Sequence, residues 1–208
     1  MQVRSDRPRR AARGPARSPK ALPDVNAAFD ACAVSDGAVL SFHHHLRNGD
    51  AVLTHVLRVA QARGLRGLGI AASSIFPVQG ELAQHMRAGT VDRVWTSYMK
   101  GDAADAIAAG ALPQPAIFQS HGGRARALAN GEIPIDVAFI AAPVCDEDGA
   151  LTGAVCRAAC GPLGYPQEDA RAASHVVALV EEIRAGPLPR QEIDGERVHH
   201  VVQVPSIG

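Results

Sequence analysis

Short apolar runs alternate with amphipathic segments along most of this chain. Continuous apolar or β-branched residues predict strands, and apolar residues recurring every three or four positions predict helices. The predicted strands are residues 37–42, 65–74, 91–99, 113–120, 135–144 and 197–204. The predicted helices are residues 23–34, 50–64, 80–89, 101–110 and 121–131, and residues 168–183 are predicted to be a short helix running into a strand. Within the second helix, Asp50 is a candidate N-cap.

This alternation defines a fold class. Strands separated by helices of about 10 to 14 residues are typical of βαβ units. The sequence therefore predicts an α/β domain, with a mostly parallel sheet covered by helices on both faces.

Composition and charge refine the domain boundaries. The chain has 208 residues, of which 47% are hydrophobic and 20% charged, as expected for one soluble globular domain. Residues 1–20 contain six Arg and one Lys against one Asp, a net charge of +6, and no apolar period. We therefore expect a disordered basic tail over residues 1–23 and a single domain over 24–208. A targeting peptide or a polyanion-binding arm are the alternatives for the tail.

No apolar stretch reaches the roughly 18 residues that a membrane-spanning helix needs, and the N-terminus lacks the apolar core of a secretory signal. The four cysteines fit reduced thiols better than a disulfide framework. We expect a cytoplasmic protein that binds neither membrane nor nucleic acid.

Polar residues follow each predicted strand. In open parallel sheets, ligands bind in the loops at the carboxyl ends of the strands. The loops that meet at this edge are residues 43–45, 73–74, 98–102, 120–124 and 142–146. They contain three adjacent histidines (His43, His44 and His45) and two serines (Ser73 and Ser74).

The three histidines cannot all face one ligand. Successive side chains of an extended segment point in opposite directions, so His44 and the pair His43 and His45 should not share a role. Without a helical HExxH motif or a nearby carboxylate pattern, we expect no metal site. The remaining interpretations are a histidine that acts on substrate and a structural hydrogen bond.

The segment SHGGRARA suggests anion binding. Gly122 and Gly123 leave their backbone N–H groups accessible at the start of a helix, where negative charge is favoured. Cations in a first helical turn oppose the helix dipole, so Arg124 and Arg126 are better explained by an anionic partner. A solvated helix face is the alternative.

Several long motifs together resemble one family. SFHHHLRNGD, ASSIFPV, SYMKGDAADAIAAGAL, SHGGRARALANGEIPIDVAFIAAPVCDEDGALTG and ACGPLGY, in this order, are similar to the alpha subunit of citrate lyase, of the CoA-transferase superfamily. The resemblance implies a CoA-transferase-like fold and a citrate CoA-transferase activity. Acetyl carried as a thioester is exchanged for citrate, giving a citryl thioester and acetate, and the citryl group is then cleaved to oxaloacetate.

The resemblance also implies partners and roles. The partners are the beta subunit and the gamma (acyl carrier) subunit in an oligomeric complex. CoA or the CoA-like prosthetic group of the carrier serves as co-substrate, and no cofactor is permanently bound. Arg47, Arg124 and Arg126 are the candidates for binding citrate. The N–H groups of Gly122 and Gly123, helped by His43 to His45 or His121, would stabilise the thioester oxyanion, and Ser73 and Ser74 complete the substrate-binding set.

This chain departs from the family pattern, and its fold also allows other functions. Family members carry a second α/β half after the region matched here, so we expect this chain to hold one half of the site. A fragment, a truncated gene product and a half that pairs with a separately encoded partner are the alternatives. Glu81, Glu132 and Glu147 are predicted to be surface residues rather than nucleophiles. The same fold also occurs in sugar-phosphate isomerases, deaminases and sensors, and a non-catalytic half of a citrate lyase assembly is a further possibility.

Overall fold

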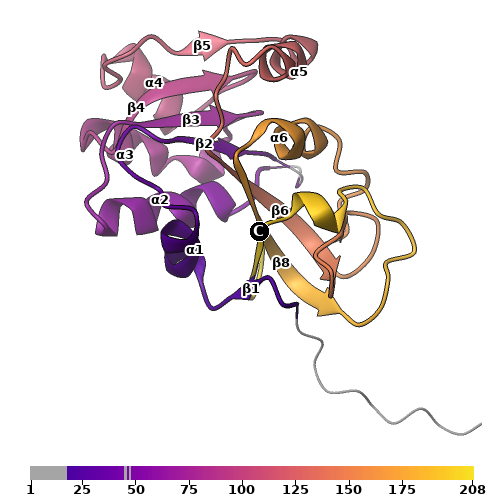
Figure 1. Ribbon diagram of the computed structural model, residues 1–208. Coiled ribbons are helices and arrows are strands. Elements are labelled where there is room, and N and C mark those ends of the chain that lie inside the picture. Colours follow the sequence, from indigo (N-terminus) through magenta and orange to yellow (C-terminus); the bar gives the residue numbers. More distant parts are fainter. Residues whose placement is uncertain (1–17, 45, 47) are drawn as a thin grey trace, which may run out of the picture.

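The computed structural model describes residues 18–208 except residues 45 and 47, and its centre is one nine-stranded sheet (Figure 1). The strand order is β1-β9-β8-β6-β2-β3-β4-β5, every pair in this order is parallel, and β7 pairs with β6 in the antiparallel direction. The strands are β1 (Ala21–Leu22), β2 (Val39–Phe42), β3 (Leu68–Ala72), β4 (Val91–Thr96), β5 (Ile117–Phe118), β6 (Val137–Asp146), β7 (Leu151–Thr152), β8 (His175–Arg184) and β9 (His200–Gln203).

Helices cover both faces of this sheet (Figure 1). The helices are α1 (Val25–Ala31), α2 (Val52–Ala62), α3 (Leu82–Arg87), α4 (Asp102–Ala108), α5 (His121–Ala129) and α6 (Pro166–Ala172), with short 3₁₀ turns η1 (Pro77–Gln79) and η2 (Gly195–Arg197). Helices α1 to α4 share one apolar core, and α5 and α6 belong to a second core on the opposite face. The predicted α/β class with a mostly parallel sheet is confirmed.

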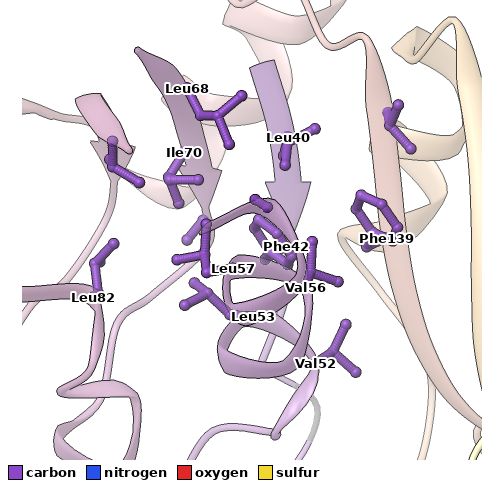
Figure 2. Close-up of a cluster of buried hydrophobic side chains, with 14 of the residues drawn as sticks. Leu40, Phe42, Val52, Leu53, Val56, Leu57, Leu68, Ile70, Leu82 and Phe139 are labelled. Atoms are coloured by element: carbon purple, nitrogen blue, oxygen red, sulfur yellow. The ribbon is translucent and has the colours of Figure 1, made fainter. Parts of the chain in front are cut away.

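Helix α2 shows how the sequence pattern produces the first core. Its buried apolar residues recur at helical spacing and face the sheet, where they meet Leu40 and Phe42 of β2, Ile70 of β3 and Phe139 of β6 (Figure 2). The rings of Phe42 and Phe139 stack with centroids 5.8 Å apart. This face fixes β2 and β3 side by side, and the loops after these two strands carry the predicted site.

The structure corrects three details of the predicted elements. Ala21 and Leu22, assigned to the tail, form strand β1 against β9. The predicted loop 142–146 is the end of β6, because this strand continues to Asp146 paired with β8. The predicted strand 113–120 is reduced to the two residues of β5. The part of the tail before residue 18 lies outside the described residues.

The order of the strands locates the point at which the winding direction of the sheet switches. From β2 the chain builds outwards through β3, β4 and β5, and then returns to place β6 on the other side of β2. In open α/β sheets the ligand binds at the carboxyl ends of the strands where the winding direction switches. That point lies between β2 and β6, directly beside His43 and His44. Among the described residues, no helix is long and apolar enough to cross a bilayer.

Asp50 gives the fold a pH dependence. Its carboxyl group is buried just before α2, and burial raises its pKa to about 7, although one of its oxygens accepts the N–H of Val52 at 2.9 Å. Because the folded pKa exceeds the unfolded value of about 3.9, the folded state binds the proton more tightly. The stabilising effect is fully present below pH 4 and is lost as the pH rises through 7.

Between pH 4 and pH 7 the free energy of unfolding of the parent protein should fall by up to about 4 kcal/mol because of Asp50. The variant Asp50→Asn should not show this fall. Urea unfolding at closely spaced pH values measures this loss in both proteins. Equal pH dependence in the parent protein and the variant would contradict the assignment.

Candidate functional site at the carboxyl edge of the sheet

The two described histidines after β2 point in different directions, as the alternation of side chains predicts. His43 is buried, and its Nε2 lies 2.8 Å from Oδ2 of Asp169 on α6. His44 is half-buried and turns towards β3, where its Nδ1 lies 2.7 Å from Oγ of Ser73. Of these two residues, His44 is the one that can meet a ligand.

Burial next to aromatic rings favours the neutral form of His44. Its ring packs against Phe76, with centroids 5.1 Å apart, and Phe76 packs against Tyr98 at 5.5 Å. Burial lowers the pKa of His44 below the usual value, and the charges of His43 and His121 lower it further. A neutral imidazole with Nδ1 held by Ser73 leaves Nε2 to accept or donate a proton towards substrate.

Ser73 orients this imidazole rather than acting as a nucleophile. Its side chain is buried, with 2% of the residue exposed, and its backbone N–H donates to the carbonyl of Phe42. The neighbouring Ser74 is also buried and donates its hydroxyl hydrogen to the carbonyl of Ser73 at 2.8 Å. Direct substrate binding by Ser73 and Ser74, which the sequence suggested, therefore has no accessible hydroxyl to support it.

Helix α5 brings His121 to the same edge of the sheet. Ser120 caps this helix and accepts the N–H of Gly123 at 3.0 Å, so this N–H is used inside the protein. Gly122 is exposed, and a Cβ added there would meet open space. His121 is exposed and stacks on Tyr165, with ring centroids 5.2 Å apart. His121 and the N–H of Gly122 remain available to a ligand, whereas Gly123 serves the cap.

Arg124 is buried and paired with an internal carboxylate, whereas the sequence suggested an anionic ligand. Only 2% of this residue is exposed, and its Nη2 lies 2.7 Å from Oδ2 of Asp169 and donates to the carbonyl of Ala71 at 3.1 Å. The anionic partner inferred for this arginine exists, but it is an internal carboxylate. Burial alone would raise the pKa of Asp169, but His43, Arg124 and Ser41 outweigh it and lower the pKa to about 2.

Arg126 is also placed differently from the prediction. It lies in the last turn of α5 rather than the first, is mostly exposed, and pairs with Glu132 through Nη1 and Oε1 at 2.7 Å. In this position it complements the negative end of the helix dipole. Its placement is explained without a ligand, so it is a surface ion pair.

The other predicted residues have separate outcomes. His45 and Arg47 lie outside the described residues. Glu81 pairs with Arg58, and Glu147 accepts the N–H of Gly186, as expected for surface residues. Within the described part of the chain, no group of three or more His, Cys, Asp or Glu side chains is arranged to hold a metal ion.

Sequence reasoning missed Asp169 and the aromatic residues around His44. Asp169 lies in a helix that was recognised, but its partners are 45 residues or more away along the chain, so no local pattern marks it. Tyr98 stands in the predicted loop 98–102, Tyr165 follows Gly164, and Phe76 lies two residues after the predicted loop 73–74. Their position in loops after strands was the available signal.

The electrostatic interaction between His121 and His44 leads to a prediction. Because the charge of His121 disfavours a proton on His44, His121→Ala should raise the pKa of His44 towards its usual value. Most of the depression should remain, since burial is its largest cause. Histidine NMR titrations measure this, with His55→Ala on the exposed face of α2 as the control. A variant that leaves the His44 titration unchanged would mean that the two rings are not electrostatically coupled.

The fold and the carboxyl-edge site together define a class. The chain superposes on glutaconate coenzyme A-transferase from Acidaminococcus fermentans with a TM-score of 0.64 and 17% sequence identity, covering 89% of this chain and 76% of that chain. At this level of identity the likeness shows the fold alone, which is that of the CoA-transferases.

The family follows from closer matches. The model of the citrate lyase alpha subunit family matches residues 19–208. The citrate lyase alpha chain of Escherichia coli (strain K12) is 37% identical over 193 residues, or 93% of this chain and 38% of that protein. The chain belongs to the citrate lyase alpha subunit family.

A solved structure supports the same assignment. The putative alpha subunit of citrate lyase from Streptococcus mutans, determined in complex with citrate, superposes with a TM-score of 0.88 at 35% identity and covers 97% of this chain and 39% of that chain. The chain thus spans about two fifths of the length of the relatives that it matches.

Proposed function

We propose that this chain contributes the His44 edge of a citrate CoA-transferase, the citrate lyase component that exchanges acetyl for citrate on a thioester. The observation that carries the proposal is the imidazole of His44, which is anchored on Ser73 after β2, has a lowered pKa and interacts electrostatically with the exposed His121 at the start of α5. Family membership favours this function over a sugar-phosphate isomerase, deaminase or sensor, which shares only the fold.

The exchange needs no net proton transfer. A citrate carboxylate oxygen attacks the acetyl carbonyl carbon, the C–S bond breaks, and a mixed anhydride and a thiolate result. The thiolate then attacks the citryl carbonyl carbon and releases acetate. CoA, or the CoA-like group of an acyl carrier subunit, supplies the thiol as co-substrate. Each attack places negative charge on a carbonyl oxygen, which must be stabilised by fixed hydrogen-bond donors.

The described residues offer such donors. We assign this role to Nε2–H of His44 and to the N–H of the exposed Gly122, which lies in the first turn of α5 where backbone N–H groups have no acceptor within the helix. The positive end of the α5 dipole adds to the stabilisation of negative charge. His121 is our candidate for a hydrogen bond to a citrate carboxylate, because Arg124 already pairs with Asp169 and Arg126 already pairs with Glu132.

The exposed apolar side chains around the site suggest a surface that packs against another part of a protein. Val78 after β3, Tyr98 after β4 and Phe118 of β5 are 63%, 44% and 60% exposed, and Tyr165 lies exposed beside His121. Exposed apolar groups gathered round a polar site are typical of an interaction surface. We propose that the second α/β half and the partner subunits of a citrate lyase complex cover this rim and exclude water from the reaction.

An exchange assay tests the proposed function. The chain, alone and with a second half from a relative, is incubated with acetyl-CoA and citrate, and citryl-CoA and acetate are followed by mass spectrometry. Exchange in the completed protein is expected. Absence of exchange under both conditions, together with binding of a sugar phosphate, would favour the alternative enzyme. Binding to the other lyase subunits without turnover would indicate a non-catalytic half.

A further inference from the structure

A single buried oxygen joins the elements that carry the site. Oδ2 of Asp169 accepts the hydroxyl of Ser41 at 2.5 Å and lies 2.8 Å from Nε2 of His43 and 2.7 Å from Nη2 of Arg124. Ser41 belongs to β2, Arg124 to α5 and Asp169 to α6. Asp169 and Ser41 are fully buried, and His43 and Arg124 are nearly so.

Each of the elements linked by Asp169 leads to a side chain of the site. The segment after β2 presents His44, and α5 begins with His121. Helix α6 follows Tyr165, on which His121 stacks. Arg124 also donates to the carbonyl of Ala71 in β3, one residue before the end of the strand that leads to Ser73. The chain segments that carry His44, Ser73 and His121 are therefore linked through one carboxylate.

Stability alone does not explain this arrangement. Buried ion pairs are often no more stabilising than apolar residues of similar volume, because removing charges from water is costly. Here the compensation is also incomplete, since Nε and Nη1 of Arg124 have no hydrogen-bond partner among the described residues. A buried polar group kept at such a cost needs another reason to be present.

We propose that Asp169 is a positioning residue, which holds His44 against Ser73 and opposite His121 by anchoring Ser41, His43 and Arg124. It does not touch substrate, and it acts through the segment that precedes His44. The inference rests on the proposed function for its effect on turnover, but its effect on His44 is a property of the folded chain. Misplacement of a reacting group by about 1 Å can cost on the order of 100-fold in rate.

Two double variants separate the effect of the hydrogen-bond acceptor at position 169 from the effect of its charge. Arg124→Gln with Asp169→Asn keeps an acceptor for Ser41 and His43, and Arg124→Met with Asp169→Leu removes it. Both variants neutralise the buried pair, so neither leaves an unpaired buried charge, and thermal unfolding confirms that each is folded. The His44 titration is then followed by NMR in the chain itself, assigned with a His44→Gln variant.

We expect the Gln/Asn variant to keep the lowered pKa of His44 and the Met/Leu variant to raise it towards the ordinary value, because the freed ring becomes hydrated. In the exchange assay, kcat should fall by about 10- to 100-fold in the Met/Leu variant and by less than threefold in the Gln/Asn variant. The KM for citrate should change little in either variant.

The outcomes distinguish this inference from the proposed function. If the two variants behave alike at His44, the positioning role of Asp169 is wrong, whether or not the parent protein exchanges acetyl for citrate. If His44 is released only in the Met/Leu variant but the parent protein shows no exchange, the positioning role stands and the proposed function fails. Asp136→Asn is the matched control, because this carboxylate binds the N–H of Val39 at the opposite end of β2.

Discussion

Replacement of His44 by alanine should lower kcat for the exchange of acetyl and citrate by about 100- to 1000-fold, the effect of removing one fixed oxyanion donor. His44 is half-buried on a polar edge, so the free energy of unfolding should change by less than about 1 kcal/mol. The KM for citrate should rise less than kcat falls, because the donor acts mainly on charge that develops in the transition state. Steady-state kinetics and urea unfolding measure the two effects.

His55→Ala is the control for this variant. His55 lies exposed on α2, away from the carboxyl edge, and its replacement should leave kcat within a factor of two. An unchanged kcat in His44→Ala would remove His44 from the reaction. Equal losses of kcat in the two variants would point to a general effect of removing surface histidines.

Arg124→Ala should have the largest effect on folding. Removing one partner of a buried ion pair leaves an uncompensated charge on Asp169, and such changes cost about 3 to 5 kcal/mol. The pKa of Asp169 is lowered, so the stability it contributes is present above pH 4 and is lost as the pH falls towards 2. Loss of Arg124 should therefore also move acid unfolding to a higher pH.

Arg126→Ala is the matched comparison on the same helix. Its pair with Glu132 is mostly exposed, so its removal should change the free energy of unfolding by no more than about 1 kcal/mol. Chemical denaturation of the two variants side by side measures the difference. If Arg124→Ala weakened citrate binding but left stability unchanged, Arg124 would be a ligand-binding residue as its sequence position first suggested.

The regular elements were predictable because their patterns are local. The apolar residues of α2 recur at helical spacing, and β6 is a continuous apolar run, so both were predicted to within two residues of their observed bounds. Strands β1 and β7 have two residues each, too few to show a period, and they exist only because β9 and β6 offer a partner. Their formation depends on tertiary pairing rather than on local sequence.

The site was predictable in location but only partly in detail. The rule for parallel sheets placed His44, Ser73 and His121 at one edge, and alternation along an extended segment separated His43 from His44. The direction of Arg124 was not predictable. The same positive charge at the start of a helix suits a bound anion or an internal carboxylate, and only the packing of α6 on α5 decides between them.

Citrate binding at the carboxyl edge is the most direct test of this account. In a ¹⁵N-labelled chain titrated with citrate, we predict shifts of the His44 and His121 ring nitrogens and of the Gly122 amide, and loss of the first two in the corresponding alanine variants. His175 and His199, whose rings lie 5.5 Å apart at the amino edge of the sheet, provide the internal comparison. Shifts confined to His175 and His199, with none at His44, would contradict the central claim.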